Sequence, residues 1–226
     1  MATWVITGAN RGLGLEFAKQ LLAEGHTIIA GVRNPEAMDF QHEQMIVYQL
    51  DVASTTSVET FAKNVKSSVS SIDVLVNNAG RMDGRWQSLE EVDPELSLDV
   101  LNVNTIGPLR VSQALWPLLQ GDKPTRVANI SSLMGSIDDC ISGRSYAYRT
   151  SKTGLNMITK ILAVEGQPDK ITVTSYHPGW AKTDMGGERA PVPASVSVQG
   201  LIGLIQQQTA ERSGRFFEYT GEELPW

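Results

Sequence analysis

The sequence has little of several residue types that mark other classes of protein. Its only cysteine, Cys140, cannot form a disulfide within the chain, which favours a reducing compartment. Its three histidines show no ligand spacing, so we expect no metal site. Nineteen basic residues stand against 25 acidic ones, without a basic run that would bind nucleic acid. Neither a membrane-length apolar run nor a signal-peptide pattern is present. These absences together predict a cytoplasmic protein with no membrane or nucleic-acid partner.

What the sequence does contain is a regular alternation of short apolar runs and amphipathic stretches, spread over its 226 residues. The runs read as buried strands: Ala2–Thr7, His26–Val32, Met45–Leu50, Ile72–Val76, Arg126–Ile130, Ile171–His177 and Gly214–Tyr219. The stretches read as helices: Gly12–Ala23, Thr55–Ser68, Pro94–Asn104, Pro108–Leu119, Tyr146–Glu165 and Ser195–Gln207. Strands joined by helical crossovers form a parallel sheet. We predict an α/β protein with a doubly wound parallel seven-stranded sheet (a Rossmann fold) and helices on both faces.

One domain, residues 1–226, accounts for this pattern, because no linker, repeat or low-complexity tract interrupts it. The segment 180–194 carries two glycines and two prolines and has weak periodicity. Such a segment within a compact domain is typical of a mobile cover over a binding site. We therefore expect a substrate lid at about residues 180–194.

The stretch Thr7–Gly14, "TGANRGLG", follows the first predicted strand and opens the first predicted helix. Glycine lets the backbone turn tightly and approach a pyrophosphate, while the helix N-terminus offers free N–H groups to the anion. A glycine trio is a weak signal alone, but this position between a strand and a helix makes it strong. The stretch therefore predicts a dinucleotide phosphate site.

The second predicted strand indicates which dinucleotide is bound. A carboxylate near its end would bind the adenosine ribose hydroxyls, but Arg33 occupies that place, and Arg11 lies in the glycine loop. Two arginines near this ribose favour a 2′-phosphate, and hence NADPH over NADH. The alternative is that both are solvated surface residues.

The predicted helix Tyr146–Glu165 contains a candidate catalytic pair. Tyr148 and Lys152 are four residues apart and share one face of the helix, whereas Tyr146 points elsewhere. A phenol that exchanges protons near neutral pH needs its pKa lowered from about 10, and a neighbouring ammonium favours this. Ser132, at the end of "NISS", is the candidate donor to a carbonyl oxygen, and Ser131 is expected to point to the opposite face. A capping role for Ser132 is the alternative.

Seven short motifs occur in a fixed order along the chain. They are "TGANRGLG", "LDV" at 50–52, "NNAG" at 77–80, "NVNTIGPL" at 102–109, "NISS", "YRTSK" at 148–152 and "HPGWAKT" at 177–183. In this order they resemble the short-chain dehydrogenase/reductase family over nearly the whole chain. Within it, "GSIDD", "YAYRTSKTGLNM", "HPGWAKTDMGG" and "TGEELPW" resemble the carbonyl-reductase branch with its sniffer and C-factor-like members.

The resemblance implies a role for each matching residue. The implied catalytic set is Asn104, Ser132, Tyr148 and Lys152, in which Asn104 holds a water that links Lys152 to solvent. The cofactor-binding set, with the glycine loop and Arg33 included, is Gly8, Asn10, Arg11, Gly12, Leu13, Gly14, Arg33, Asp51, Val52, Asn78, Ala79, Gly80, Tyr148, Lys152, Pro178, Gly179 and Thr183. One departure is the gap of sixteen positions between Ser132 and Tyr148. It places an insertion, "GSIDDCISGR", beside the pocket and leaves Ser136 as a second candidate donor.

The predicted activity is NADPH-dependent reduction of a ketone, aldehyde or quinone carbonyl, with Tyr148 as proton donor. Residues 82–92, 133–143 and 180–192 are expected to form the pocket wall, with Trp86 and Trp180 either stacking on substrate or buried under loops. Two alternatives stay open: an NAD(P)-binding signalling or sensor protein with little turnover, and an alcohol dehydrogenase that works oxidatively. The expected partner is a small carbonyl compound, and apolar helix faces favour a homodimer.

Overall fold

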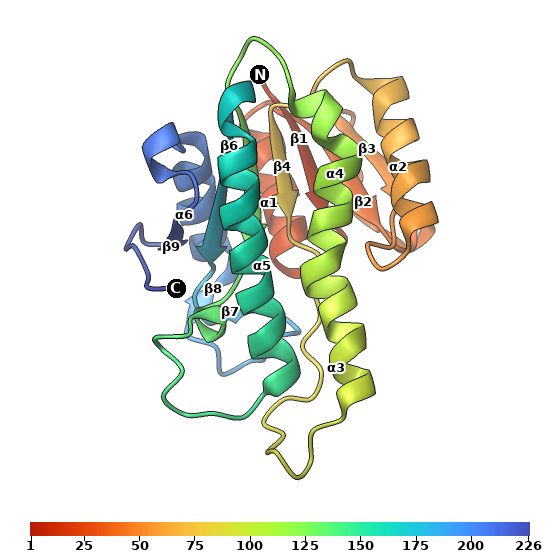
Figure 1. The fold of residues 1–226 in the computed structure, drawn as a ribbon. Coiled ribbons are helices and arrows are strands. Elements are labelled where there is room, and N and C mark those ends of the chain that lie inside the picture. The colour runs from red at the N-terminus through yellow and green to blue at the C-terminus, as the bar shows by residue number, and fades with distance from the viewer.

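The computed structural model describes residues 1–226, and its centre is a seven-stranded parallel sheet (Figure 1). The strands lie in the order β3-β2-β1-β4-β5-β6-β9, and every neighbouring pair is parallel. Their bounds are Thr3–Thr7 (β1), Thr27–Val32 (β2), Met45–Gln49 (β3), Val74–Asn77 (β4), Thr125–Ile130 (β5), Ile171–His177 (β6) and Phe216–Glu218 (β9). The predicted fold class is confirmed.

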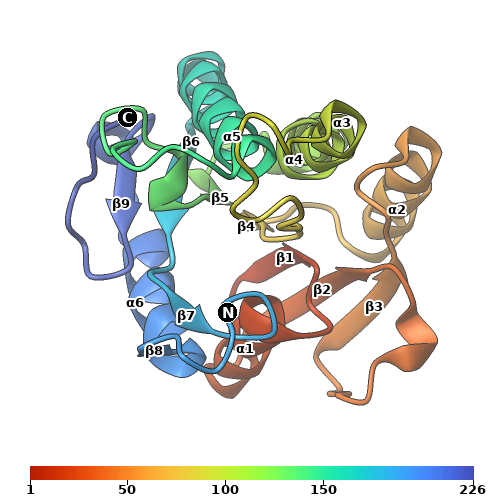
Figure 2. The ribbon, with the colours of Figure 1, turned by 90° about the horizontal axis from the view of Figure 1, so that it is seen from below.

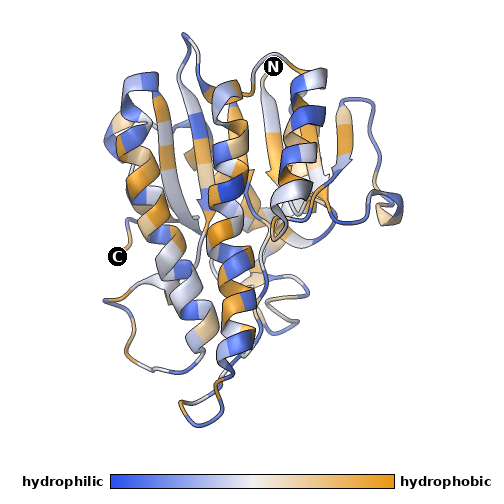
Figure 3. Ribbon diagram, turned by 45° about the vertical axis from the view of Figure 1, so that its right-hand side comes forward, coloured by the Kyte–Doolittle hydropathy of each residue, from blue (hydrophilic) through white to orange (hydrophobic).

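Six α-helices cover the two faces of the sheet. They are α1 (Gly12–Ala23), α2 (Thr55–Ser68), α3 (Pro94–Leu101), α4 (Gly107–Leu119), α5 (Tyr146–Glu165) and α6 (Ala194–Gln206). One core cluster lies between the sheet and α1 with α6, and the other lies between the sheet and α2, α4 and α5. In Figure 3, where the ribbon is coloured by hydropathy, the strands between these layers are largely apolar. No helix is long and apolar enough to cross a membrane.

Strand β1 shows why the sheet is buried on both faces. Its side chains alternate in direction, as the pleat requires. Trp4 and Ile6 belong to the cluster under α1 and α6, whereas Val5 belongs to the cluster under α2, α4 and α5. All three are at most 1% exposed. A strand buried on both faces needs a continuous apolar run, and this explains why the sequence pattern located it.

The order of the strands places a crevice at one edge of the sheet. The chain winds outward from β1 to β2 and β3, and it then returns to place β4 on the other side of β1. Loops leaving the carboxyl ends of β1 and β4 therefore diverge to opposite faces, and ligands of such sheets bind at this switch point. Figure 2 looks onto this edge of the sheet.

Three segments differ from the sequence prediction. The predicted helices 94–104 and 108–119 are one continuous rod, because α3 passes through a π-helical turn, Asn102–Ile106, directly into α4. Strand β9 is shorter than the predicted 214–219. The segment 180–194 contains two short strands, β7 (Ala181–Lys182) and β8 (Val192–Pro193), which pair with each other in parallel. A strand of two residues is too short to show an alternation of apolar and polar side chains, so the sequence pattern did not predict β7 and β8.

Candidate active site

A cavity of about 560 Å³ lies along the carboxyl ends of the strands. It is lined by Gly8, Asn10, Arg11, Gly12, Leu13, Gly31, Val32, Arg33, Leu50, Asp51, Val52, Asn78, Ala79, Gly80, Arg81, Met82, Asp83, Val103, Ile130, Ser131, Tyr148, Lys152, Pro178, Thr183, Asp184 and Met185. Every residue predicted to bind the cofactor lies on this wall except Gly14 and Gly179. Residues that follow β1, β2 and β4 thus line the same cavity as residues of α5 and of the segment after β6.

The glycine loop between β1 and α1 adopts the conformation that its composition allows. Gly8 and Gly12 have φ of +69° and +53°, in the left-handed region that other residues rarely enter. Gly14 lies behind the loop, where a Cβ atom would collide with the carbonyl oxygen of Gly8 and with Asn78. The first two glycines thus shape the wall of the cavity, and the third permits the close packing of helix on strand.

Asn78 and Thr7 hold this loop against the end of β4. The Nδ2 group of Asn78 donates to the carbonyl oxygens of Thr7 at 2.9 Å and of Gly8 at 3.2 Å. The hydroxyl of Thr7 accepts from the backbone N–H groups of Asn78 and Ala79 at 3.0 and 2.9 Å. The "NNAG" motif therefore fixes the position of the glycine loop in addition to lining the cavity.

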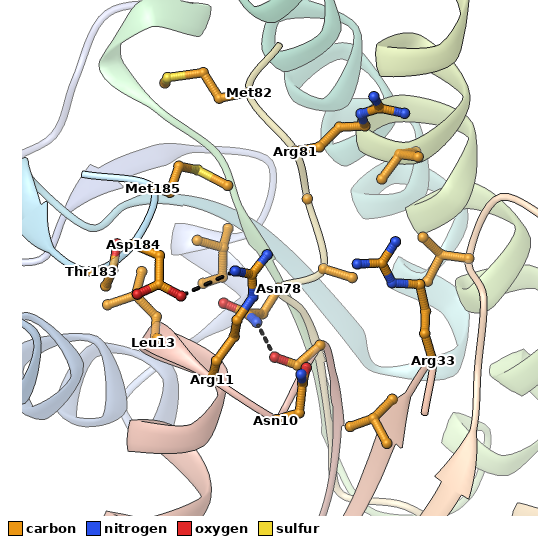
Figure 4. Close-up of a pocket in the computed structure, with 18 of the residues that line it drawn as sticks. Asn10, Arg11, Leu13, Arg33, Asn78, Arg81, Met82, Thr183, Asp184 and Met185 are labelled. Carbon is orange, nitrogen blue, oxygen red and sulfur yellow. Dashed lines mark hydrogen bonds and ion pairs between the residues drawn. The ribbon is translucent and has the colours of Figure 1, made fainter. Parts of the chain in front are cut away.

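The two predicted phosphate-binding arginines both line the cavity (Figure 4). Arg33 follows β2, and none of the ion pairs in the structure involves it. Arg11 pairs with Asp184 from the segment after β6, at 3.0 Å between Nη1 and Oδ2. The sequence motif did not reveal this contact, because 173 residues separate the two partners. Arg33 is consequently the arginine whose charge is free for an anion.

These residues fit a dinucleotide. Backbone N–H groups at the start of α1 and two left-handed glycines face the middle of the cavity, which suits a pyrophosphate. The unpaired charge of Arg33 lies at one end. Tyr148 and Lys152 lie on the wall at the helix α5 side. No group of three or more His, Cys, Asp or Glu side chains is placed to hold a metal ion.

Tyr148 is buried in the first turn of α5, and the side chain of Ser132 lies near enough to its hydroxyl to influence its pKa. Burial raises the pKa of Tyr148 to about 12, although Ser132 and the charge of Arg85 act in the opposite direction. Lys152 is not among the groups that lower it. The prediction that Lys152 depresses this pKa is therefore wrong for the chain by itself, because burial outweighs the favourable charges.

Ser132 combines the two roles that the sequence left open. Its hydroxyl lies near Tyr148, and it also caps the short 3₁₀ turn Leu133–Gly135 by accepting from Met134 N at 3.2 Å. Ser131 donates to Oδ1 of the buried Asn156 on α5 at 2.7 Å, and it lines the cavity, whereas Ser132 does not. Ser136 accepts from Asp139 N at 3.1 Å within the insertion. Of the three serines, only Ser132 lowers the pKa of the candidate phenol.

Lys152 lies one turn after Tyr148 and is 5% exposed. Its Nζ atom donates to the carbonyl oxygen of Ile130 at 2.8 Å and lies 5.7 Å from the centroid of the Tyr148 ring. Burial lowers the pKa of Lys152 to about 8. The predicted pair thus shares one face of α5, with the ammonium anchored to the end of β5.

Asn104 lies fully buried within the π-helical turn. Its Nδ2 group donates to Arg81 O at 2.8 Å and to Ser151 Oγ at 3.0 Å, and its Oδ1 atom accepts from Arg81 N at 2.9 Å. A Cβ on Gly80 would lie 3.2 Å from Oδ1 of Asn104 and 3.7 Å from Nζ of Lys152. The missing side chain of Gly80 therefore leaves a space between these two polar atoms.

The loop carrying Ser132 touches α5 at Gly135. A Cβ atom on Gly135 would lie 2.7 Å from Lys152 Cβ and 2.8 Å from Lys152 C, so the loop and the helix pack backbone to backbone. Hydrogen bonds from Thr153 and Asn156 to Gly135 O, at 3.0 and 3.2 Å, hold this contact. The position of Ser132 relative to Tyr148 is thereby fixed.

A chain of buried polar side chains crosses the sheet behind the site. Asn77 of β4 donates to Ser112 of α4 at 3.1 Å and to Asn129 of β5 at 2.9 Å. Asn129 donates to Thr159 of α5 at 2.8 Å, and Thr159 bonds to Ser175 of β6 at 2.8 Å. Sequence patterning did not predict this chain, because its members come from five separate elements. It fixes the position of α5 relative to the strands.

The segment after β6 contributes two of its three predicted residues to the cavity. Pro178 and Thr183 line it. Gly179 does not, because it lies against the ring of Tyr219, which a Cβ atom would approach to 2.8 Å. Asp184 and Met185 also line the cavity, as expected for the predicted wall segment 180–192, although the sequence did not assign them to the cofactor.

Comparisons with known proteins agree with this geometry. A family model for short chain dehydrogenases matches residues 2–192. The chain is 41% identical to the C-signal of Myxococcus xanthus over 169 residues, which cover 75% of this chain and 100% of that protein. It is similar to the crystal structure of the NADPH-bound carbonyl reductase from chicken fatty liver, with a TM-score of 0.91, 30% identity and coverage of 100% and 99% of the two chains.

A further similar structure is the carbonyl reductase Sniffer of D. melanogaster, with a TM-score of 0.95, 31% identity and full coverage of both chains. The family model spans most of the sheet and the whole candidate site. The predicted resemblance is thus confirmed by an independent match of sequence and of structure. This chain belongs to the short-chain dehydrogenase family of oxidoreductases.

Proposed function

We propose that this protein is an NADPH-dependent carbonyl reductase that acts on a ketone, aldehyde or quinone. The observation that carries the proposal is the placement of Tyr148 and Lys152 on the cavity wall, one turn apart on α5, with Ser132 near the phenol. The similarity to carbonyl reductases, including one bound to NADPH, supports the assignment.

The glycine loop and Arg33 are the groups we assign to the cofactor. Backbone N–H groups near Gly12 and Leu13 hold the pyrophosphate, and Arg33 binds the 2′-phosphate that distinguishes NADPH from NADH. Lys152 and Thr183 flank the nicotinamide end. When bound, NADPH supplies the hydride.

Ser132 and Tyr148 act on the carbonyl oxygen. Both hydroxyls donate to it, and Tyr148 passes its proton to the oxygen as negative charge develops there. A pKa of about 12 keeps the phenol protonated at neutral pH, which suits a proton donor. Lys152, whose Nζ atom lies 5.7 Å from the centroid of the Tyr148 ring, belongs to the path that returns a proton to the phenolate.

Proton resupply runs past Asn104 and Lys152. The Oδ1 atom of Asn104 accepts one bond from Arg81 N and retains a second lone pair. We assign the space beside Gly80 to a water that bridges Asn104 and Lys152. Restoring the proton of Tyr148 through this water completes the cycle.

The segment 180–194 is assigned as the substrate lid. Pairing of β7 with β8 closes it into a loop, and the ion pair between Arg11 and Asp184 joins it to the glycine loop. The lid therefore lies across the cofactor cavity and bounds its substrate side.

We also propose that the protein forms a homodimer through helices α3 to α5. Exposed apolar side chains on this surface include Leu98, Leu109, Met157, Ile161 and Val164. Sedimentation at micromolar concentration tests this assignment, and a single monomeric species contradicts it.

A binding protein with little turnover is the competing function, favoured by the 41% identity to the C-signal. Loss of NADPH absorbance with a panel of quinones, diketones and aromatic aldehydes separates the two. We expect turnover, and Tyr148→Phe to lower kcat by about a thousandfold while the Kd for NADPH stays within about twofold. Tight NADPH binding without turnover of any carbonyl would leave the binding function standing.

A further inference from the structure

Two loops on the substrate side of the cavity are tied to each other. The segment 84–87 precedes α3, and the segment 143–145 precedes α5; both project beyond the carboxyl ends of the strands (Figure 1). Trp86 N donates to Ser145 Oγ at 3.0 Å, Ser145 N donates to Gln87 O at 3.2 Å, and Arg144 Nη1 donates to Trp86 O at 3.1 Å. The first of these bonds joins Trp86 and Ser145, which are 59 residues apart in the chain.

The tied residues hold an unfavourable backbone conformation. Trp86, Arg144 and Ser145 have φ of +64°, +62° and +54°, in the left-handed region. Such a conformation costs about 1–3 kcal/mol for a residue other than glycine and persists only where its surroundings impose it. Residues of this kind concentrate at binding sites. The three bonds between the loops therefore hold Trp86 in a position that it would not adopt alone.

This position is close to the proposed proton donor. Ser145 lies three residues before Tyr148, which is about 4.5 Å along a helix axis. The neighbouring Arg85 places its guanidinium carbon 5.6 Å from the centroid of the Trp86 ring. Arg85 is also near enough to Tyr148 for its charge to lower the pKa of that phenol. Trp86 remains 54% exposed and Arg85 is exposed as well, so both are open to a ligand.

The charge of Arg85 is not neutralised by a neighbour. None of the four ion pairs in the structure includes it. The acidic residue nearest to it in sequence, Asp83, pairs with Arg81, and Glu91 is bonded to Ser88 and faces Arg144. Arg85 is therefore a free cation whose charge acts on Tyr148. Such a cation attracts anionic ligands toward Tyr148, the proposed proton donor.

We propose that Arg85 and Trp86 form a recognition site for carbonyl substrates that carry a carboxylate on a flat, aromatic body. The guanidinium binds the carboxylate through charge-assisted hydrogen bonds, and the indole supports the ring. The inference rests on the proposed reduction and names its substrate class: aromatic keto or aldehyde acids rather than neutral carbonyls.

A matched pair of aldehydes tests the proposal, 4-formylbenzoate and its neutral methyl ester. We expect Arg85→Ala to lower kcat/KM for the acid by about ten- to a hundredfold, and for the ester by less than about threefold. Arg85→Lys retains part of the preference, because it keeps the charge without the planar fork. The control, Lys66→Ala on α2, removes an exposed charge far from the cavity and leaves the ratio of the two aldehydes unchanged.

Calorimetric titration of 4-formylbenzoate supplies a readout that does not depend on turnover. The Kd should rise about tenfold or more in Arg85→Ala and much less in Lys66→Ala. Equal losses for acid and ester, or an unchanged Kd in Arg85→Ala, overturn the inference even if both aldehydes are reduced. Failure of the wild-type protein to oxidise NADPH with either aldehyde counts against the proposed reduction instead, and the titration then decides the recognition site by itself.

Discussion

The two sides of the cavity achieve the same kind of backbone geometry by different means. On the cofactor side the left-handed positions belong to Gly8 and Gly12, which enter that region without strain. On the substrate side they include, besides Gly84 and Gly143, the residues Trp86, Arg144 and Ser145, which are held there by bonds between distant loops. The backbone of the glycine loop is therefore specified locally by glycine, whereas that of the substrate side also depends on contacts between distant loops.

After Tyr148→Phe, the largest effect is expected at the junction of the two sides. Ser132→Ala removes a donor to the carbonyl oxygen and should lower kcat by about a hundredfold or more. Ser136→Ala is the matched control, because its hydroxyl bonds only within the insertion, and it should change kcat by less than about threefold. Steady-state kinetics with one aldehyde measures both, and near-normal turnover in Ser132→Ala would falsify the assignment.

A change confined to the cofactor side should leave the substrate side unaffected. Arg33→Asp removes the unpaired cation and adds a charge that repels a 2′-phosphate, so kcat/KM with NADPH should fall about ten- to a hundredfold. The value with NADH should change far less. The ratio of kcat/KM for two carbonyl substrates should remain as in the wild type. Equal losses with both cofactors contradict the NADPH assignment.

Lys152 lies between the cofactor side and the substrate side. The loss of its proton sets the pH dependence of kcat/KM for NADPH. Because burial lowers its pKa to about 8, the ammonium is present below that pH and is lost above it. Tyr148, with its pKa at about 12, stays protonated throughout. The kcat/KM for NADPH should therefore fall about tenfold per pH unit above pH 8. In Lys152→Arg, which cannot lose its charge, any remaining activity should not show this decline.

The smallest effect is expected at the hydrogen bonds between the segments 84–87 and 143–145. Ser145→Ala removes the acceptor for Trp86 N, and it should lower the free energy of unfolding by about 1 kcal/mol. The KM for an aromatic aldehyde should rise while the Kd for NADPH is unchanged. Urea unfolding and fluorescence titration measure the two quantities. A weakened Kd for NADPH would show that the two sides are not independent.

The sequence predicted most of the cofactor side for a physical reason. A buried parallel strand needs a continuous apolar run, and a phosphate loop needs glycine, so both leave local patterns. Four-residue spacing likewise selected Tyr148 and Lys152 on one face of α5. These signals depend on neighbours in the chain, and they located the glycine loop, Tyr148 and Lys152 on the cavity wall. Other wall residues, such as Asp51, Asn78 and Thr183, were implied by the family resemblance.

What the sequence could not show depends on partners far apart in the chain. The pairing of Arg11 with Asp184 spans 173 residues, and the bond from Trp86 to Ser145 spans 59. Burial of Tyr148 is also a property of the packed structure, which is why a predicted lowering of its pKa became a rise. The bonds of Asn104 follow from a π-helical turn that has no sequence period of its own.

Gly135 divides the stretch between Ser132 and Tyr148 into two parts with different freedom to change. Everything from Ser132 to Gly135 is locked against α5, because the contact with Lys152 admits no side chain. Residues 137–143 lie beyond that lock and are mostly exposed, among them Ile137 and Ile141. This outer part can lengthen, shorten or be exchanged during evolution without altering the spacing of the serine and the tyrosine. A library of replacement loops at 137–143 is accordingly a direct route to new substrate ranges on an unchanged catalytic pair.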